Sequence, residues 1–370
     1  MTGRTAWPAA AALVAAVAAC APTITTVVRG AALRPGPAVT EPPGALRVLH
    51  LADFGSNSGQ QAEVSRAVAA AQARAPFALA MVAGDNLYEC GPDAGRPGAE
   101  TCAFAADGNT VATPPLGADP LFARLHEVPL ASLTGPVYLS LGNHDVSAWS
   151  GCDTADLEPR DASRRKACLE VAHRSARWTM PARHYVVDEG PARFVVIDSN
   201  AVYLDYGGFT IEEELAFVTE AVKGCAVKAC FLVGHHPPVT AGTHVRDFDA
   251  TRTARMARLL AAAGPEIRAV LAGHDHDLQH LRTAGGLDVL VSGNGAKAVV
   301  DETFQRVNDD GQLLFASVRP GLGILTVHPE GWSYRFEDVT GQPLHCCAAR
   351  GAGRCEPVPC GPGPSVALAP

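Results

Sequence analysis

Apolar runs of strand length recur along the chain from residue 45 onward, and each run ends abruptly in polar or small residues. Continuous apolar runs of this length are typical of strands that are buried on both faces of a sheet. The runs occupy residues 45–53, 77–85, 136–145, 192–199, 229–237, 267–275 and 287–295. We therefore expect these segments to build the core of a large sheet structure.

Helical patterns fall between the strand-like runs. Residues 59–74 have a helical period with Glu63 and Arg66 on a polar face, and residues 250–263 have another. Residues 211–223 begin with acidic side chains and end in Lys223, an order that complements the helix dipole. Strands that alternate with helices predict an α/β fold. Two later runs, 321–329 and 331–339, predict a hairpin.

The N-terminal segment has the pattern of an export signal. Arg4 precedes an apolar stretch at 9–19 that is too short to span a bilayer comfortably, and the stretch closes on "VAAC" at 17–20. This ending resembles a bacterial lipoprotein signal with Cys20 as the lipidated residue, which would tether the protein to a membrane at the cell envelope. The alternative is ordinary cleavage at a small-residue site, which would leave a soluble secreted or periplasmic protein.

Composition sets the domain organisation. The predicted parts are a signal at 1–20, a linker rich in Pro, Gly and Ala at 21–45, a folded catalytic domain at 46–340 and a cysteine-rich tail at 341–370. With 370 residues, 47% of them hydrophobic, the chain can bury a large core. The net charge of −8 and the absence of a basic run argue against nucleic acid as a partner. The oligomeric state is not indicated.

The cysteines predict a disulfide framework. Eleven are present, and ten remain when Cys20 is set aside, an even number that suits an oxidising compartment. Close spacing favours three local pairs, Cys90–Cys102, Cys152–Cys168 and Cys225–Cys230. A zinc site formed by the last four cysteines is an alternative, although no C-x-x-C pair supports it.

Polar side chains that can bind metal or transfer protons follow the predicted strands. In α/β sheets, sites form at the carboxyl ends of strands. The residues at those ends are Asp53, Asp85, Asn143, His144, His235, His274 and His276. The stretch "LAGHDHDLQH" at 271–280 would, by itself, suit either a polar surface loop or a metal site. Together the strand ends favour a metal or acid–base site.

Five ordered motifs carry a family resemblance. They are "DFG" (53–55), "GDNLY" (84–88), "GNHD" (142–145), "VGHHP" (233–237) and "GHDHDLQHL" (273–281). In order and rough spacing they resemble the motifs of the calcineurin-like metallophosphoesterases. A tyrosine three residues after the second aspartate, here Tyr88 after Asp85, resembles the motif of the purple acid phosphatases. The compact size of the chain resembles their small tartrate-resistant type. The resemblance covers about residues 46 to 338 and implies a four-layer αββα sandwich of two mixed sheets flanked by helices.

The resemblance also implies a dinuclear metal centre. The first ion would be held by Asp53, Asp85, Tyr88 and His276, and the second by Asp85, Asn143, His235 and His274, with Asp85 as the bridge. Phenolate and carboxylate oxygens favour Fe(III), and an amide oxygen with two imidazoles suits Fe(II), Zn or Mn. The implied reaction is attack of a metal-bound hydroxide on a small phosphate monoester, as in an acid phosphatase.

Two further histidines receive catalytic roles from the resemblance. His144 would bind the substrate phosphate, with Asp145 orienting its ring, and His244, nine residues after His235, would protonate the leaving alcohol. His236 is left out of the site, and His280 is expected at the surface.

The sequence departs from the purple acid phosphatase pattern at one position, where Phe54 replaces the usual tryptophan. Kinases also carry "DFG", but no glycine-rich loop or catalytic-loop motif accompanies it here.

Two other functions stay open. The same centre could serve a phosphodiesterase or nucleotidase, although no clear aromatic clamp for a nucleoside is visible in the sequence. A surface-anchored binding protein could retain the fold without catalysis. Loss of a metal ligand would mark that case, and all seven ligand positions are filled.

Overall fold

A computed structural model describes residues 44–149, 151–154, 156–297 and 304–360. The predicted signal at 1–20, with Cys20, lies outside the described residues, as does nearly all of the predicted linker. Within the described ranges, none of the helices has both the length and the apolar character needed to cross a membrane.

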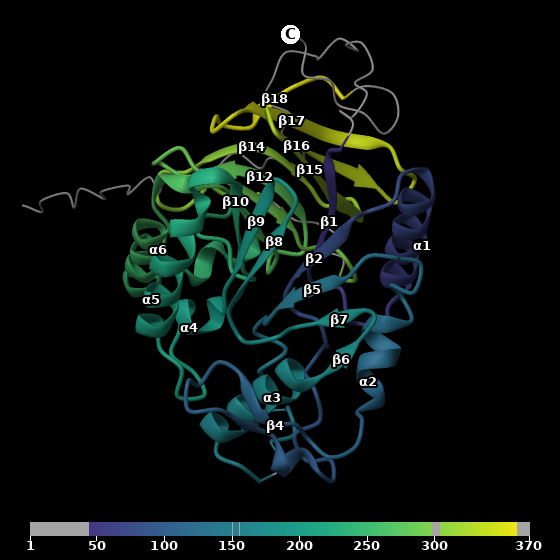
Figure 1. Cartoon of the computed structure of the whole chain (residues 1–370), viewed down its shortest axis with the longest axis vertical. Helices are drawn as coiled ribbons and strands as arrows, with labels where there is room; N and C mark the ends of the chain where they lie inside the picture. The colour runs from purple at the N-terminus through teal and green to yellow at the C-terminus, as the bar shows by residue number, and fades with distance from the viewer. Residues whose placement is uncertain (1–43, 150, 155, 298–303, 361–370) are drawn as a thin grey trace, which may run out of the picture.

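Two large mixed sheets form the centre of the molecule (Figure 1). In spatial order, the nine-stranded sheet contains β18 (Glu356–Pro357), β17 (Pro343–Arg350), β16 (Gly331–Asp338), β15 (Gly321–His328), β1 (Leu46–Leu51), β2 (Leu79–Ala83), β5 (Val137–Ser140), β7 (Trp178–Thr179) and β6 (Arg174–Ser175). The seven-stranded sheet contains β14 (Gln312–Ser317), β12 (Leu278–Arg282), β13 (Asp288–Ser292), β11 (Ile267–Ala272), β10 (Ala229–Val233), β9 (Ala192–Val196) and β8 (Tyr185–Glu189).

Parallel strands occupy the middle of each sheet. In the first sheet β1, β2 and β5 are parallel, and in the second β9, β10, β11 and β13 are parallel. Strand β7 is also parallel to β5, the other pairings in both sheets are antiparallel, and β15 and β16 form the predicted hairpin. The mixed α/β architecture predicted from the resemblance is therefore confirmed.

Helices cover the outer faces of the sheets. Figure 1 shows α1 (Gly59–Arg74) and α2 (Pro120–Phe122) on one side, and α4 (Ser199–Tyr203), α5 (Ile211–Ala221) and α6 (Ala250–Ala263) on the other. Short helical turns are η1 (Ala99–Thr101), η2 (Ala123–Glu127), η3 (Val222–Val227), η4 (Thr243–Asp247) and η5 (Gly264–Glu266). The predicted helix at 211–223 ends early, at Ala221, because the chain tightens into η3, where the Cys225–Cys230 disulfide closes.

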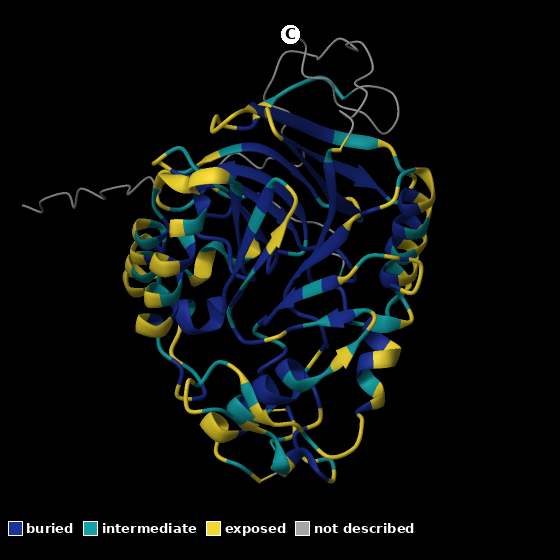
Figure 2. Cartoon of the chain, viewed as in Figure 1, coloured by how far each residue is buried: buried dark blue, intermediate teal, exposed yellow. Residues whose placement is uncertain are grey.

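The strands are buried on both faces, as the apolar runs predicted (Figure 2). In β10, Phe231 packs into the core between the sheets, where its ring centroid lies 5.5 Å from that of Trp332 in β16. The next residue, Leu232, packs into a second core beneath α5 and α6. Alternation along the strand therefore fills two apolar layers at once.

Two disulfides, one just before α3 (Pro159–Ala172) and one within it, differ from the prediction. Cys225–Cys230 is confirmed, but the other two local pairs are wrong. Cys90 pairs with Cys152, and Cys102 pairs with Cys168. The reason is tertiary, because α3 packs against η1, β3 (Ala103–Phe104) and β4 (Val111–Thr113). The two segments are thus joined to each other, and neither is closed on itself.

The last cysteines also form disulfides, Cys346–Cys360 and Cys347–Cys355, which contradicts the zinc alternative. Strands β17 and β18 carry the nine-stranded sheet past residue 340, into the predicted tail.

The expectation that His280 lies at the surface is wrong. Its side chain in β12 is fully buried, with Nδ1 2.9 Å from His345 Nε2 and Nε2 3.2 Å from Asp288 Oδ1.

Candidate metal centre

The predicted ligands gather where the parallel strands of both sheets end. Asp53 and Asp85 follow β1 and β2, and Asn143 follows β5. His235 and His274 follow β10 and β11 in the other sheet. Carboxyl ends of parallel strands meet at one edge, so residues far apart in sequence come together there.

Glycines allow these strand ends to approach closely. A Cβ added to Gly142 would lie 2.2 Å from the backbone nitrogen of Asp85, and one on Gly84 would lie 2.7 Å from the His235 side chain. Asp53 and Asp85 themselves have left-handed backbones, with φ of 55° and 53°. Such backbones cost energy in residues other than glycine and are concentrated at functional sites.

The first predicted ligand group is brought together. Tyr88 donates its hydroxyl proton to Asp53 Oδ1 over 2.8 Å, and His276 Nε2 lies 3.2 Å from the same hydroxyl. Ligand atoms of Asp53, Asp85 and His276 all lie within 4.8 Å of one another. One cation could therefore contact the whole group.

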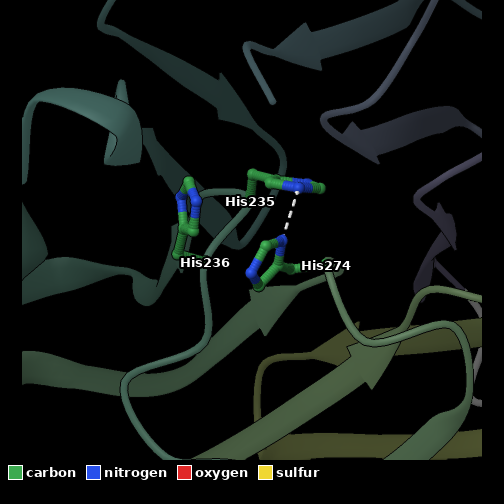
Figure 3. A group of neighbouring side chains, drawn as sticks. All are labelled: His235, His236 and His274. Atoms are coloured by element: carbon green, nitrogen blue, oxygen red, sulfur yellow. Dashed lines mark hydrogen bonds between the residues drawn. The ribbon is translucent and has the colours of Figure 1, made fainter. Parts of the chain in front are cut away.

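The second predicted group converges from three strand ends. His235 Nε2 lies 2.9 Å from Asn143 Oδ1 and 3.2 Å from His274 Nδ1, and Figure 3 shows the two imidazoles pointing toward each other. Asn143 Oδ1 is 3.0 Å from His274 Nδ1. Asp85 Oδ1 lies 3.4 Å from His235 Nε2, so this carboxylate borders both groups. Its position suits the predicted bridge.

The donor set fits two metal ions. His235 Nδ1 lies 2.9 Å from the Ala83 carbonyl oxygen, which can only accept, so this nitrogen carries the proton. The lone pair of His235 Nε2 is therefore aimed at the oxygen of Asn143. Acceptor atoms that face one another at this distance repel unless a cation lies between them. Imidazole and amide donors suit a divalent ion, and the carboxylate and phenol oxygens of the other group suit a harder ion.

Burial shapes the proton affinities at the site. Desolvation, reinforced by the charges of Asp53 and Asp85, raises the pKa of Tyr88 well above its usual value. Desolvation, together with neighbouring histidines, lowers the pKa of His274 well below its usual value. His274 is therefore neutral and able to bind a metal, whereas ionisation of Tyr88 requires a nearby cation.

His144 lies beside the centre, but Asp145 does not orient it as expected. His144 Nδ1 lies 2.6 Å from the carbonyl oxygen of Glu89, which leaves Nε2 on the side of Asp85, 3.9 Å from Oδ2. Asp145 is fully buried and accepts the backbone N–H groups of Asn86, Leu87 and Gly142 at 2.7–2.9 Å. It ties two ligand-bearing loops together, and the Glu89 carbonyl holds the His144 ring.

His244 is held by a residue that sequence reasoning missed. Its ring stacks on His274 with centroids 3.9 Å apart, and its Nδ1 lies 3.0 Å from Asp275 Oδ1. The same carboxylate oxygen accepts the His244 backbone N–H at 2.9 Å. The sequence did contain a signal for Asp275, because this residue lies between the two histidines of "GHDH".

His236, which sequence reasoning leaves out of the site, lies beside this pair (Figure 3): its ring centroid is 4.5 Å from that of His274, and ligand atoms of all three histidines, His235 included, lie within 4.8 Å of one another. It is buried, its Nδ1 lies 3.0 Å from the Ser199 hydroxyl oxygen, and its ring stacks on Tyr203. Phe54 is also buried, and its ring meets His126 edge-on, with the centroids 6.1 Å apart.

Comparison with known proteins was made by sequence and by structure. The family model described as calcineurin-like phosphoesterase matches residues 46–278. Purple acid phosphatase 7 of Arabidopsis thaliana is 25% identical over 323 residues, which cover 82% of this chain and 85% of that protein.

Similar folds occur among solved structures. GAP50, described as the anchor in the inner membrane complex of Plasmodium, has a TM-score of 0.60 at 15% identity and covers 83% of this chain and 89% of its own. The purple acid phosphatase PPD1 of yellow lupin has a TM-score of 0.56 at 13% identity, over 88% of this chain and 57% of its own. At these identities the structural likeness concerns the fold alone.

Proposed function

The chain belongs to the calcineurin-like phosphoesterase family of metal-dependent phosphoric ester hydrolases, and from this premise we propose an exported, acid-phosphatase-like enzyme that hydrolyses small phosphate monoesters. Its dinuclear centre would hold Fe(III) beside a divalent ion, Fe(II), Zn or Mn. The observation that carries the proposal is the donor arrangement. All seven predicted ligands line one strand-end site, with Asp85 between the two groups and with His144 and His244 alongside.

The bound ions would supply an activated water and positive charge for the ester oxygens. The side chains of the protein would bind the phosphate and transfer the proton. The Glu89 carbonyl fixes the proton of His144 on Nδ1 and so turns Nε2 toward the phosphate site. Asp275 accepts from Nδ1 of His244, which leaves Nε2 of that ring to pass a proton to the departing alcohol.

One observation favours a second candidate, a non-catalytic anchor protein of the same fold. A structural neighbour, GAP50, is described as the anchor in a membrane complex. The complete donor set favours the hydrolase instead, because a protein that only anchors has no need for converging buried histidines. A phosphodiesterase or nucleotidase with the same centre is the remaining alternative.

Metal analysis combined with an ester screen tests the proposal. The purified protein should contain two ions per chain, and it should cleave monoesters faster than diesters. A preference for diesters would favour the phosphodiesterase alternative. A metal-loaded protein without activity on either class would favour the anchor.

The tyrosine assignment has a spectroscopic test. Iron-loaded protein should be coloured by charge transfer from Tyr88 to Fe(III), and Tyr88→Phe should remove the band. Tyr203→Phe is the matched control, because Tyr203 stacks on His236 and is not one of the predicted ligands. A band that survives in Tyr88→Phe would show that Tyr88 is not a ligand.

Export and lipid attachment at Cys20 complete the proposal, supported by the signal-like N-terminus. Fractionation of cells that express Cys20→Ala tests the attachment. The variant should leave the membrane fraction, and retention there would contradict lipidation.

A further inference from the structure

Three aromatic rings form a row that leads from the metal centre to the surface. Tyr88 belongs to the predicted ligands and is 9% exposed. Its ring centroid lies 4.4 Å from that of His144. The indole of Trp149 meets His144 edge-on, with the centroids 5.0 Å apart and the planes at 88°. The row therefore runs from a buried ligand, past the predicted phosphate binder, to an outer ring.

Trp149 is partly exposed to solvent. It is 46% exposed, and among the exposed large apolar side chains of the described residues it is the aromatic one. Tryptophan is enriched at binding surfaces, because its ring offers a large apolar area together with a polar N–H group. Its place beside His144 sets it apart from the other exposed apolar side chains.

The loop around Trp149 is fixed to the site. The Trp149 carbonyl accepts the backbone N–H of Cys152 at 3.1 Å, and Cys152 is disulfide-bonded to Cys90, two residues after Tyr88. The Ser147 hydroxyl donates to the Asn143 carbonyl at 2.8 Å. Contacts on both sides of Trp149 in sequence thus join the loop to ligand-bearing segments.

The other candidate surface beside the row is already covered. The Lys297 ammonium lies 4.4 Å from the Tyr88 ring centroid and forms an ion pair with Glu89. Tyr88 is thereby shielded from the organic part of a substrate. Trp149 is therefore the exposed ring of the row.

We propose that Trp149 binds an aromatic ring in the alcohol part of the substrate, so that the enzyme prefers monoesters of alcohols that carry an aromatic group. This inference rests on the proposed function, since it assumes that the phosphate lies beside His144. A phosphate held there would lie one ring away from the indole, so that the substituent of the ester can reach Trp149. Trp149 is then a specificity-determining residue that does not take part in the chemical step.

A matched pair of substrates isolates the ring. The esters 2-phenylethyl phosphate and 2-cyclohexylethyl phosphate have similar leaving alcohols and sizes, so they differ chiefly in aromatic character. Stacking of one ring predicts a preference of about tenfold in kcat/KM for the phenyl ester. Trp149→Leu should bring the ratio to about one, and Trp149→Phe should keep most of the preference. Val227→Ala, at an 87% exposed position in η3, is the control and should leave the ratio unchanged.

A second pair of substrates tests whether the aromatic ring can be a nucleobase. Adenosine 5′-phosphate and ribose 5-phosphate share the leaving alcohol and differ by the base. A preference for adenosine 5′-phosphate that Trp149→Leu removes would extend the site to nucleobases. A phenyl preference without a base preference would restrict it to simpler aromatic alcohols.

Binding separates this inference from the proposed function. Calorimetric titration of the metal-loaded protein with benzylphosphonate and cyclohexylmethylphosphonate needs no turnover. Tighter binding of benzylphosphonate that depends on Trp149 supports the inference, even if every ester is inert and the hydrolase proposal fails. Equal binding, no binding, or a preference that survives in Trp149→Leu overturns the inference, while ester hydrolysis would leave the proposed function standing.

Discussion

We expect a buried histidine, His126, to make the stability of this protein depend on pH. His126 in η2 is fully buried, and its ring meets Phe54 and Trp178 edge-on. Neither ring nitrogen has a hydrogen-bond partner among the described residues. Burial, helped by the charge of His173, lowers the pKa of His126 from 6.5 to about 3.

The sign of the effect follows from linkage. Below pH 6.5 the unfolded chain takes up a proton at His126, and the folded chain does not, so acid favours unfolding. The loss begins near the unfolded pKa and grows until the pH approaches the folded one. With these pKa values, the group costs about 2 kcal/mol of unfolding free energy between about pH 7.5 and about pH 5.

The substitution His126→Phe tests this figure. Phenylalanine keeps the aromatic packing and removes the titration, so the variant should lose about 2 kcal/mol less than the wild type on acidification. Urea unfolding, followed by circular dichroism at both pH values, measures the difference. Phe122→Leu in the same aromatic cluster is the control and should destabilise the protein equally at both pH values. An unchanged pH dependence in His126→Phe would refute a depressed pKa.

Three further predictions concern the site and its supports. Asp145→Ala removes three buried backbone hydrogen bonds to a carboxylate, and urea unfolding should show a loss of about 3–5 kcal/mol. The pair Cys90→Ser and Cys152→Ser opens a loop with a sequence separation of 62, and the unfolding free energy should fall by about 4 kcal/mol. His244→Ala should reduce kcat/KM about 100-fold for alkyl esters but less than about tenfold for p-nitrophenyl phosphate.

The first two have a control variant, and the third is checked by the contrast between ester classes. The exposed Asp107 also accepts two backbone N–H groups, and Asp107→Ala should cost about 1 kcal/mol or less; a similar loss in both variants would contradict the role given to Asp145. Opening Cys225–Cys230, with a separation of 5, should cost about 2 kcal/mol, and a larger loss than at Cys90–Cys152 would overturn the entropy argument. An equal fall for both ester classes would show that His244 is not the acid.

Local pattern determined a large part of this protein. The apolar runs predicted strands buried on both faces, and Phe231 and Leu232 of β10 do fill separate cores. Polar residues at the strand ends predicted that these side chains lie together, because the carboxyl ends of parallel strands meet at one edge of a sheet. Asp53 and His274, 221 positions apart, are linked by a hydrogen bond of 2.8 Å. The strands and the position of their polar ends can be predicted from the sequence, because they depend on local periodicity and on strand direction.

Tertiary packing alone decided the rest. Cys90 pairs with Cys152 because the segment before α3 folds onto the ligand loop, which spacing along the chain cannot reveal. His280 is polar and still buried, because β17 brings His345 to its ring. Asp145 supports backbone where a contact to His144 was expected, and Trp149 stands beside that histidine only in the folded protein. In each of these contacts the two residues come from different elements of the fold. Which residues meet depends on how those elements pack, and the local sequence pattern does not contain this information.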